Sequence, residues 1–411
     1  MSLKKVDVLV IGGGPSGSSA AYWLSKAGLN VSVLEKKVFP REKTCGDGLT
    51  PRTIKQLEDM GLQKKLEKFH RYDGLRTIAH GKTMELAWPK HKEFKQYGYC
   101  VRRSDLDLMT LENASEAGAT VYYGHEATEV DFEESKSEVK FVAPKSLTGK
   151  NAQQSKNIIR TVTAVFKKDA SELKFEPKLV IVCEGSNSRI GRKLGVTRNK
   201  SYPMGLAARG YFKSDLSTDP WIESHLDLKD KEGNNLPGYG WVFPLGDGVV
   251  NVGVGLLSTF KGWKKVNTSK LYEAFVETAP EHWGLKWENE LGPHTGGRLP
   301  TGGSVSPKTG VNWLLAGDSA GLINPFNGEG ISYGYESGRY ASEVALDYLK
   351  NGTNLISYEK KLWDEFGPYY RNAKLFVNQM GRPFTMRLGT KIGMNSKATM
   401  KLMLKYMANL W

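Results

Sequence analysis

Three closely spaced glycines near the N-terminus, Gly12, Gly14 and Gly17, constrain the fold of this chain more than any other feature. They follow an apolar, β-branched run at residues 6–11 that is typical of a buried strand in a parallel sheet. Apolar residues at helical spacing come next, and a second strand is predicted at residues 31–34. The order strand, glycine turn, helix and strand predicts a βαβ unit at the start of an α/β fold.

Each glycine has a separate expected role if this unit binds a dinucleotide. Gly12 would make the tight turn, Gly14 would let the backbone approach a pyrophosphate, and Gly17 would let the helix pack closely on the strand. Ser16 lies in the same turn, where free N–H groups at the start of a helix can hold phosphates. Glu35 ends the second strand, at the distance where an acidic side chain reaches a ribose hydroxyl. A purely structural βαβ unit is the alternative.

Length and composition favour a two-domain enzyme. The 411 residues, 39% of them hydrophobic and 25% charged, suit a soluble protein with a large buried core. No apolar run approaches the ~18 residues that span a bilayer, and the N-terminus leads directly into the first strand. We therefore expect neither a transmembrane helix nor a signal peptide. Cys45, Cys100 and Cys183 lack metal-ligand spacing, which predicts no metal site and a reducing, cytoplasmic setting.

Positive charge is concentrated near the C-terminus. The net charge of +14 suggests an anionic partner, and nucleic acid is not expected because no nucleic-acid-binding module is present. Residues 366–411 contain eight Lys or Arg and no Asp or Glu. Within them, a helical stripe of apolar residues lies opposite lysines: Met400, Met403, Leu404, Met407 and Trp411. A basic amphipathic helix favours an anionic membrane surface, with packing on the core as the alternative.

Three further segments carry candidate site residues. A glycine-broken loop at residues 39–52, FPREKTCGDGLTPR, lies where a bound dinucleotide would run toward its reactive end. The segment PGYGWVFP at 237–244 places Tyr239, Trp241 and Phe243 on one face of a strand, as an apolar wall. At 317–331, Gly-Asp and then NPFNGEGI lead into a long helix. Residues 135–178 contain many lysines and are predicted to form a solvent-exposed segment without functional residues, with strands at 139–142 and 158–166.

The order of these motifs resembles the two-dinucleotide-binding flavoprotein fold of p-hydroxybenzoate hydroxylase. Within it, CGDGLTPR and PGYGWVFPLG resemble the geranylgeranyl reductase family, and with NPFNGEGI they look most like its menaquinone reductase branch. The resemblance covers nearly the whole chain. It implies an α/β fold in which a Rossmann-type FAD-binding domain is interleaved with an antiparallel β-sheet substrate domain. The expected ranges are 1–68, 96–197 and 290–348 for FAD binding, 69–95 and 198–289 for substrate, and 349–411 for a basic helical C-terminal region.

The resemblance also implies which residues hold FAD. Besides the glycine turn and Glu35, they are Cys45, Gly46, Gly48, Arg103, Ala127, Asp318, Gly330 and Ile331. Arg103 is preferred to Arg102 by its spacing to Leu106 and Asp107. The helix that begins near Gly330 would direct its free N–H groups at the flavin N1–C2 edge. Glu184 stands where the superfamily usually has aspartate, which weakens the expectation that this loop handles a nicotinamide donor in the usual way. Cys183 is expected to lie in the core.

The expected chemistry is reduction of an isoprenoid double bond, in a menaquinone side chain or a geranylgeranyl group. Tyr239, Trp241 and Phe243 would line the substrate cavity, since each buried CH₂ of a prenyl chain contributes ~0.8 kcal/mol. An isolated alkene is not electrophilic, so an acid must protonate one carbon as hydride reaches the other. The candidate acids are Cys45, Tyr239, Tyr333 and a bound water, and Cys45 has a bystander role as its alternative.

Several alternatives stay open at the level of sequence. The electron donor could be NAD(P)H, ferredoxin or another reductant. An FAD-dependent monooxygenase or halogenase acting on an apolar substrate is the alternative enzyme, and a flavin-dependent membrane sensor is the non-enzymatic alternative. The tail predicts a cytoplasmic protein that is peripheral on the inner face of the cell membrane.

Overall fold

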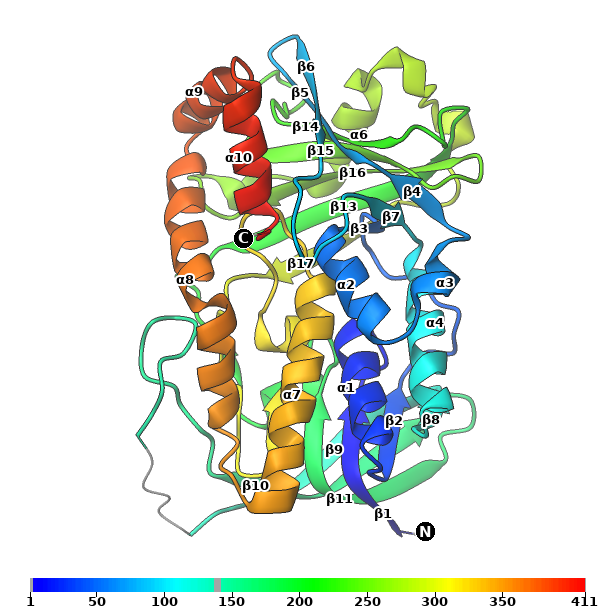
Figure 1. Ribbon diagram of the computed structural model, residues 1–411, viewed down its shortest axis with the longest axis vertical. Helices are drawn as coiled ribbons and strands as arrows, with labels where there is room; N and C mark the ends of the chain where they lie inside the picture. Colours follow the sequence, from blue (N-terminus) through cyan, green and yellow to red (C-terminus); the bar gives the residue numbers. More distant parts are fainter. Residues whose placement is uncertain (1–2, 137–141, 411) are drawn as a thin grey trace.

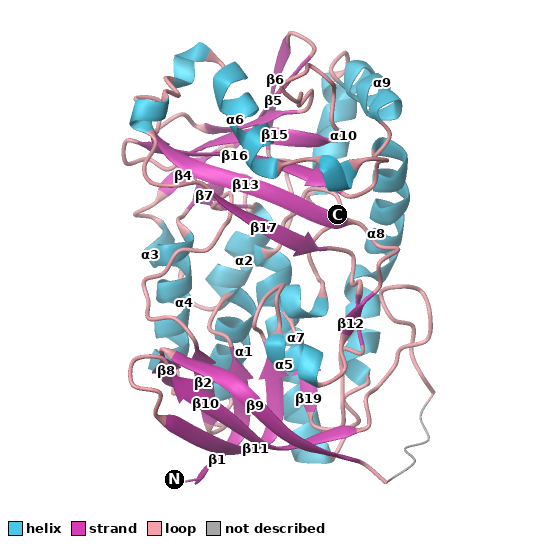
Figure 2. Ribbon diagram, turned by 180° about the vertical axis from the view of Figure 1, so that it is seen from behind, coloured by secondary structure: helices cyan, strands magenta, loops and turns pink. Residues whose placement is uncertain are grey.

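The computed structural model of the protein describes residues 3–136 and 142–410. The molecule is elongated, with one large sheet toward each end and long helices running between them, as Figure 1 and Figure 2 show from opposite sides. The strand predicted at 139–142 falls, except for its last residue, outside the described residues. The strand predicted at 158–166 is confirmed as β10 (Asn157–Phe166).

The first sheet is built around the N-terminal strand. Strand β1 (Leu3–Ile11) pairs in parallel with β2 (Val31–Glu35) on one side and with β11 (Glu172–Val182) on the other. Strand β8 (Thr120–Tyr123) extends the parallel part beyond β2, and β19 (Trp313–Leu315) pairs with the end of β11. The apolar residues of β2, β19, the second half of β1 and the end of β11 are buried in the core, as is typical of parallel strands covered on both faces. Strands β9 (His125–Glu134) and β10 add an antiparallel extension along the first half of β11.

Two parallel helices lie together against this sheet. Helix α1 (Pro15–Lys26) begins directly after Gly14, with proline in its first turn. It packs on α7 (Ile331–Asn351), and the approach is close because α7 carries a glycine at the contact. A Cβ at Gly338 would lie only 2.2 Å from the Ser16 carbonyl oxygen. The N-termini of both helices are therefore held near the carboxyl ends of β1 and β11 (Figure 1).

The second sheet has the strand order β17-β13-β16-β15-β14-β5-β6. All neighbours are antiparallel except β14 and β5, which pair in parallel. Helix α6 (Thr268–Thr278) packs on one face, and the other face looks toward the first sheet (Figure 2). The strands are β5 (Gly74–Ala79), β6 (Lys82–Ala87), β13 (Met204–Lys213), β14 (Trp221–His225), β15 (Gly238–Pro244), β16 (Val249–Leu257) and β17 (Thr295–Pro300).

The edge strand of this sheet corrects one predicted boundary. Residues 295–300 were expected in the FAD-binding domain, within 290–348, but they form β17 and pair with β13 from Met204 to Arg209. The segment is short and glycine-rich, so only the partner strand reveals which sheet it joins.

Smaller elements connect the two sheets. Strands β3 (Gly48–Leu49), β7 (Gly98–Cys100) and β4 (His70–Tyr72) form a three-stranded sheet, so the predicted substrate segment 69–95 begins outside the second large sheet. The remaining short elements are α2 (Pro51–Asp59), α3 (Gln63–Leu66), α4 (Arg103–Glu116), α5 (Arg189–Lys193), β12 (Thr197–Arg198), β18 (Val305–Ser306) and the 3₁₀ turns η1 (Trp263–Lys265), η2 (Glu281–Trp283), η3 (Trp287–Asn289) and η4 (Gly317–Ala320).

Three helices form the C-terminal region. Helix α8 (Ser357–Met380) runs from beside α7 toward the second sheet, and α9 (Pro383–Gly393) and α10 (Lys397–Met407) lie beside that sheet (Figure 1). The end of α10 is held in place by side chains that donate hydrogen bonds to carbonyl oxygens at and just after its last residue. Tyr369 donates a hydrogen bond to the Met407 oxygen at 2.8 Å, and Arg52 donates one to the Asn409 oxygen at 2.9 Å. No helix among residues 3–136 and 142–410 is both long and apolar enough to cross a bilayer.

Candidate functional site

A continuous cavity of about 520 Å³ runs between the two large sheets. It begins at the glycine turn after β1, passes the loop around Cys45, and ends against the inner face of α10. All predicted site residues line it except Gly17: Gly12, Gly14, Ser16, Glu35, Cys45, Gly46, Gly48, Arg103, Ala127, Tyr239, Trp241, Phe243, Asp318, Gly330 and Ile331. Residues that are far apart in the sequence are thus brought together at one site.

The three glycines differ in what a side chain would meet. Gly12 has φ +107°, and its Cβ would lie 2.3 Å from the Cys183 carbonyl oxygen. A Cβ at Gly17 would lie 1.8 Å from the Gly12 carbonyl oxygen, because the first turn of α1 rests on the turn itself. A Cβ at Gly14 would meet only arginine side chains, at 3.7 Å or more. Gly14 therefore faces open cavity, where a ligand can approach its backbone.

Glu35 is held rigidly at the end of β2. Its Oε2 accepts a hydrogen bond from the Gly13 amide and its Oε1 accepts one from the Lys37 amide, both at 2.9 Å. The residue is buried and lines the cavity beside the glycine turn. A carboxylate fixed in this way can accept hydrogen bonds from vicinal hydroxyl groups, as a ribose offers.

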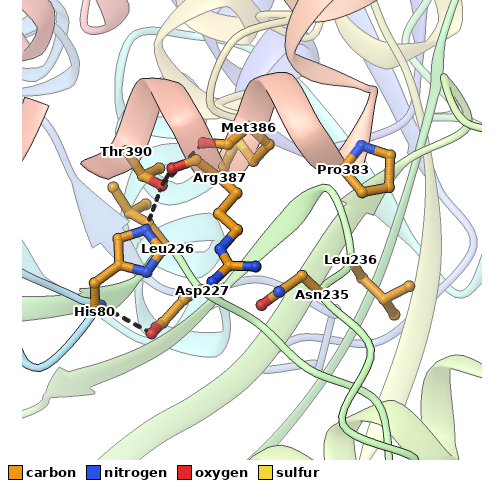
Figure 3. A pocket seen from close by; sticks show the side chains of 9 residues that line it. All are labelled: His80, Leu226, Asp227, Asn235, Leu236, Pro383, Met386, Arg387 and Thr390. Atoms are coloured by element: carbon orange, nitrogen blue, oxygen red, sulfur yellow. Dashed lines mark hydrogen bonds between the residues drawn. The ribbon is translucent and has the colours of Figure 1, made fainter. Parts of the chain in front are cut away.

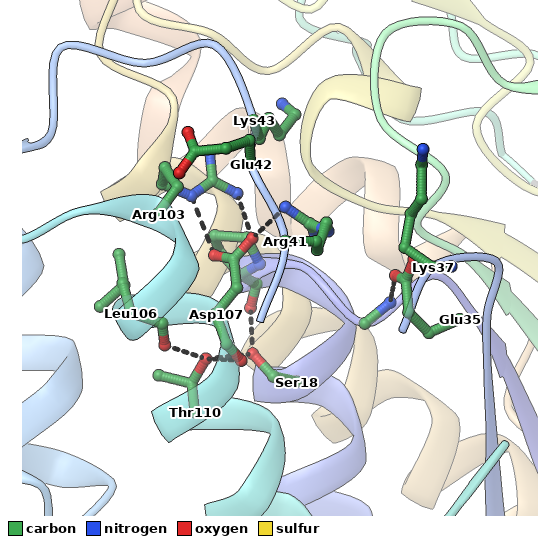
Figure 4. Close-up of polar contacts among 12 residues, drawn as sticks. Ser18, Glu35, Lys37, Arg41, Glu42, Lys43, Arg103, Leu106, Asp107 and Thr110 are labelled. Atoms are coloured by element: carbon green, nitrogen blue, oxygen red, sulfur yellow. Dashed lines mark hydrogen bonds and ion pairs between the residues drawn. The ribbon is translucent and has the colours of Figure 1, made fainter. Parts of the chain in front are cut away.

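Two arginines stand over the glycine turn. Arg103, at the start of α4, forms a two-point ion pair with buried Asp107, at 2.9 and 2.7 Å. Arg41, from the loop after β2, reaches the same carboxylate at 2.7 Å, and Figure 4 shows both guanidinium groups converging on it. One carboxylate balances two cations, so a net positive charge remains within 4 Å of the Gly14 Cβ position. This position suits a diphosphate.

Aromatic side chains form the wall of the cavity beyond Cys45. The ring centroids of Tyr239 and Trp241 are 5.9 Å apart, and those of Trp241 and Phe243 are 6.1 Å apart. The loop packs directly on this wall, since a Cβ at Gly46 or Gly48 would lie 3.2 Å from the Phe243 ring. The dinucleotide end of the cavity therefore leads without interruption into an apolar end.

The comparisons with known proteins agree with this geometry. A family model described as an FAD binding domain matches residues 5–233. The menaquinone reductase of Mycobacterium tuberculosis is 36% identical over 98% of this chain and 91% of its own length. The digeranylgeranylglycerophospholipid reductase 2 of Methanosphaera stadtmanae is 27% identical over 89% of this chain and 85% of its own. The crystal structure of a geranylgeranyl bacteriochlorophyll reductase-like protein from Thermoplasma acidophilum matches with a TM-score of 0.78 at 21% identity, covering 100% of this chain and 97% of that chain.

The chain belongs to the geranylgeranyl reductase family of FAD-dependent oxidoreductases. The predicted family, fold class and cofactor are confirmed. The residues present fit FAD, because the cradle at Gly14 is open, the two arginines leave a positive charge beside it, and Glu35 is positioned for a ribose. The individual contacts of Ala127, Asp318, Gly330 and Ile331 with FAD stay predictions, although all four line the cavity.

A second acidic residue of this reductase, Asp318, lines the cavity near the start of α7. Asp318, in the turn after β19, forms an ion pair with Lys43 at 3.3 Å. Gly330 precedes the first turn of α7, and a Cβ there would lie 3.3 Å from the Asp318 carboxylate. The start of α7 therefore reaches the cavity with free N–H groups, which can stabilise negative charge on a bound flavin.

A polar cluster in the second sheet holds the Cys45 loop of the reductase. Asp47 is buried with φ +63°, and its Oδ2 accepts hydrogen bonds from Tyr211 at 2.7 Å and Asn251 at 2.8 Å. Asn251 also donates to the Cys45 carbonyl oxygen at 2.8 Å and accepts from the Trp241 indole at 2.9 Å. Burial raises the pKa of Asp47 to about 6. This cluster fixes the loop relative to the aromatic wall.

Two expectations about the site need correction, and one about Cys183 is confirmed. Tyr333 does not line the cavity; it is fully buried, and its hydroxyl accepts hydrogen bonds from Asn324 and Asn409. Cys183 lies just beyond the end of β11; it is buried in the core, as expected, and it also lines the cavity beside Gly12. The methionine stripe of α10 also faces the cavity: Met400, Met403, Leu404 and Met407 line its apolar end, so this stripe is not a free membrane-binding face.

Sequence reasoning missed Arg41, Asp47 and Asn251 as site residues. Arg41 and Asp47 lie in the loop that the sequence singled out, but nothing in their spacing indicates that their side chains contact Asp107 and Tyr211. Asn251 interrupts an alternating row of valines in β16, which is a detectable signal for a polar contact on a buried strand.

Replacing Arg41 with alanine is expected to weaken FAD binding while leaving the fold intact. The variant removes one charge-assisted contact to the diphosphate, worth ~1.5–3 kcal/mol or roughly 10- to 100-fold in Kd. Asp107 keeps its two-point ion pair with Arg103, so the urea midpoint should not change. Fluorescence titration of the apoprotein with FAD measures the effect. Arg102→Ala is the matched control, because Arg102 pairs with Asp247 instead, and its Kd should stay within twofold. Equal losses in both variants would contradict a role specific to Arg41.

Proposed function

We propose that the protein reduces a carbon–carbon double bond in the isoprenoid chain of a lipid, with the menaquinone side chain as first candidate and a geranylgeranyl group as second. The observation that carries the proposal is the course of the cavity, which continues from the cofactor site along an apolar path to α10. The menaquinone reductase of Mycobacterium tuberculosis, matched along nearly the full chain, supports the choice of substrate class.

The apolar path has one rigid side and one adaptable side. The second sheet contributes Leu75, Leu86, Trp88, Ile222 and Leu226, and α10 contributes its methionine stripe. Ile222 and Leu226 alternate with Glu223 and His225, whose side chains interact with each other away from the cavity. Methionine side chains are flexible and adjust to irregular apolar ligands, which suits a branched polyprenyl chain.

FAD, when bound and reduced, supplies hydride to the substrate. The protein's own residues hold the alkene against the cofactor site and exclude water from it. Trp241 and Phe243 bury the chain on one side, where the Cys45 loop packs against them. Cys45 and Tyr239 remain the sequence-based candidates for a catalytic role, and both line the cavity where the cofactor site meets the aromatic wall.

An anaerobic assay tests the proposal. The holoenzyme is reduced with dithionite, mixed with a polyprenyl menaquinone in detergent, and the product is analysed by mass spectrometry. A gain of two hydrogens in the side chain supports the reductase, and the same assay with a geranylgeranyl lipid ranks the two substrates. Turnover only in the presence of oxygen would identify the monooxygenase or halogenase alternative. Absence of any product with both lipids would favour the sensor.

We also propose that the reductase meets its substrate at an anionic membrane surface, using α9 rather than α10. Phe384, Leu388 and Ile392 are spaced four residues apart on α9 and are 75%, 46% and 59% exposed. The opposite side of α9 sits on the second sheet, where Thr390 contacts His80 at 2.8 Å (Figure 3). The surrounding tail, residues 366–411, carries eight basic and no acidic side chains. Exposed apolar side chains among cations suit anionic lipid headgroups.

The double variant Leu388→Glu/Ile392→Glu is expected to lose vesicle binding. It removes two apolar anchors and adds two charges that an anionic surface repels, so the apparent affinity should fall at least about tenfold. Co-sedimentation with phosphatidylglycerol vesicles at low and high salt measures it. Leu291→Glu is the control, because Leu291 is an exposed leucine outside the tail. Unchanged sedimentation of the double variant would contradict the assignment to α9.

A further inference from the structure

One carboxyl group on the cavity wall was not anticipated from the sequence. Glu329 lies in the loop before α7 and lines the cavity beside Gly330. Three hydroxyl groups bind the same oxygen of its carboxyl group: Oε1 accepts from Thr50 at 2.5 Å, Ser332 at 2.7 Å and Thr53 at 3.4 Å. Its Oε2 is buried and has no hydrogen-bond partner among the described residues. A charged carboxylate with one bare buried oxygen is costly, so this environment favours the neutral acid.

The nearest cation does not compensate Glu329. Arg52 forms an ion pair with Glu336 at 2.7 Å and donates a second hydrogen bond to it at 2.9 Å. Its remaining hydrogen bond goes to the Asn409 carbonyl oxygen. Burial raises the pKa of Glu329, and the hydroxyl donors, Arg52 and the Asn327 side chain lower it only in part. The titratable groups that face it are Arg52 on α2, Glu336 on α7, Tyr72 on β4, Tyr239 on β15, and Tyr333, Tyr369 and Tyr370 from α7 and α8.

Glu329 stands where the cofactor site meets the aromatic wall. Thr50, which binds it, ends the loop that begins near Cys45. On the other side, Tyr239 donates a hydrogen bond to the Asn327 carbonyl oxygen at 2.7 Å, two residues before Glu329. The loop thus links the start of α7 to the wall that would hold the reacting alkene.

We propose that Glu329 is the proton donor of the double-bond reduction. The inference rests on the proposed function. The Glu329 proton would form a C–H bond at the less substituted carbon of the double bond as the π bond breaks. The hydride that FAD supplies when bound and reduced would form a C–H bond at the more substituted carbon. FAD is thereby oxidised, and Glu329 is left as a carboxylate that regains a proton from solvent. Positive charge that develops on the substrate is stabilised as this carboxylate forms.

The two sequence-based candidates that line the cavity, Tyr239 and Cys45, are weaker proton donors than Glu329. The Tyr239 hydroxyl already donates its hydrogen to Asn327, and burial raises the pKa of Tyr239 to about 12. Burial also raises the pKa of the Cys45 thiol. Their hydrogens are therefore less readily transferred than that of a carboxylic acid.

The variant Glu329→Gln tests the proposal, because it keeps the shape of the side chain and removes the transferable proton. We expect kcat to fall about 10²- to 10⁴-fold, with KM, FAD content and flavin absorption spectrum unchanged. Wild-type kcat should decrease as pH rises through the pKa of Glu329, because the acid form is the active one. The residual activity of the variant should not show this decrease. Infrared difference spectra should show a protonated carboxyl band in the wild type that the variant loses.

Three comparisons make the outcome decisive. Glu329→Asp should recover part of the lost turnover and restore the pH dependence, which a merely structural role would not require. Tyr239→Phe and Cys45→Ala, which alter the cavity wall without removing the Glu329 carboxyl group, should each keep the pH dependence and the carboxyl band of the wild type, whatever their turnover. If Glu329→Gln turns over within twofold of the wild type, or the carboxyl band persists, Glu329 is not the donor, although the reductase function stands. If the wild type itself gives no reduced product, the proposed function fails instead.

Discussion

The variant Gly17→Ala is expected to fail to fold into a stable FAD-binding protein. Its new methyl group would lie 1.8 Å from the Gly12 carbonyl oxygen and 2.9 Å from the Gly12 carbonyl carbon, both of them backbone atoms. Helix α1 must then move away from β1, but α7 packs against its other side at glycine contacts that leave no space. We expect a loss of at least ~3 kcal/mol in the free energy of unfolding. Urea denaturation and the FAD content of the purified protein measure it.

Gly14→Ala is the matched comparison from the same turn. Its methyl group would have only ordinary contacts, at 3.7 Å or more, with the side chains of Arg41 and Arg103. We expect a normal urea midpoint for the apoprotein, but FAD affinity at least about tenfold lower, because the methyl occupies the approach to the diphosphate. If Gly14→Ala destabilised the apoprotein as much as Gly17→Ala does, the separate roles of the two glycines would be wrong.

The second large effect is expected far from the cavity, at Lys308. Its ammonium group forms an ion pair with Glu359 on α8 at 3.5 Å, and both side chains are completely buried. Lys308→Met leaves the Glu359 carboxylate buried without its cation, at an expected cost of ~3–5 kcal/mol in the free energy of unfolding. The tail would loosen first, because this pair anchors the beginning of α8 to the segment before β19.

The pH dependence of Lys308→Met has a defined sign. Burial already raises the pKa of Glu359, and removing the cation raises it further. The folded variant therefore binds a proton at a pH where the unfolded chain does not, so its stability improves as pH falls through the folded pKa toward ~4.3. Urea midpoints at pH 8 and pH 5 should show a smaller deficit at pH 5. The double variant Lys308→Met/Glu359→Leu should regain most of the lost stability, and a deficit equal to that of the single variant would exclude the stranded charge as its cause.

Much of the cofactor site could be predicted from local patterns. The glycine turn, Glu35 and Arg103 each belong to a short segment whose strand or helix position follows from neighbouring residues, and all reach the cavity. The resemblance added Asp318 and Ala127, which lie on elements distant in sequence. Such segments are predictable because a backbone turn and a helix start depend on residues within a few positions of each other.

The remaining parts of the site depend on long-range packing. Arg41 contacts Asp107 across the glycine turn, and Glu329 acquires its environment from Thr50, some 280 residues earlier. The apolar spacing of α10 predicted the helix correctly. It could not predict whether lipid, the protein core or a cavity covers the apolar face, because all three favour the same pattern. Only the fold placed Met403 on the cavity and Phe384 on the surface.

The sequence by itself determined the family, the cofactor and the strand–turn–helix that begins the FAD site, because these depend on backbone conformation within short segments. The tertiary structure decided that β17 joins the second sheet, that α10 closes the apolar end of the cavity, and that the Glu329 carboxyl is buried without a counter-ion. Burial and charge compensation are properties of neighbours in space, and residues that far apart in the chain meet only once it has folded.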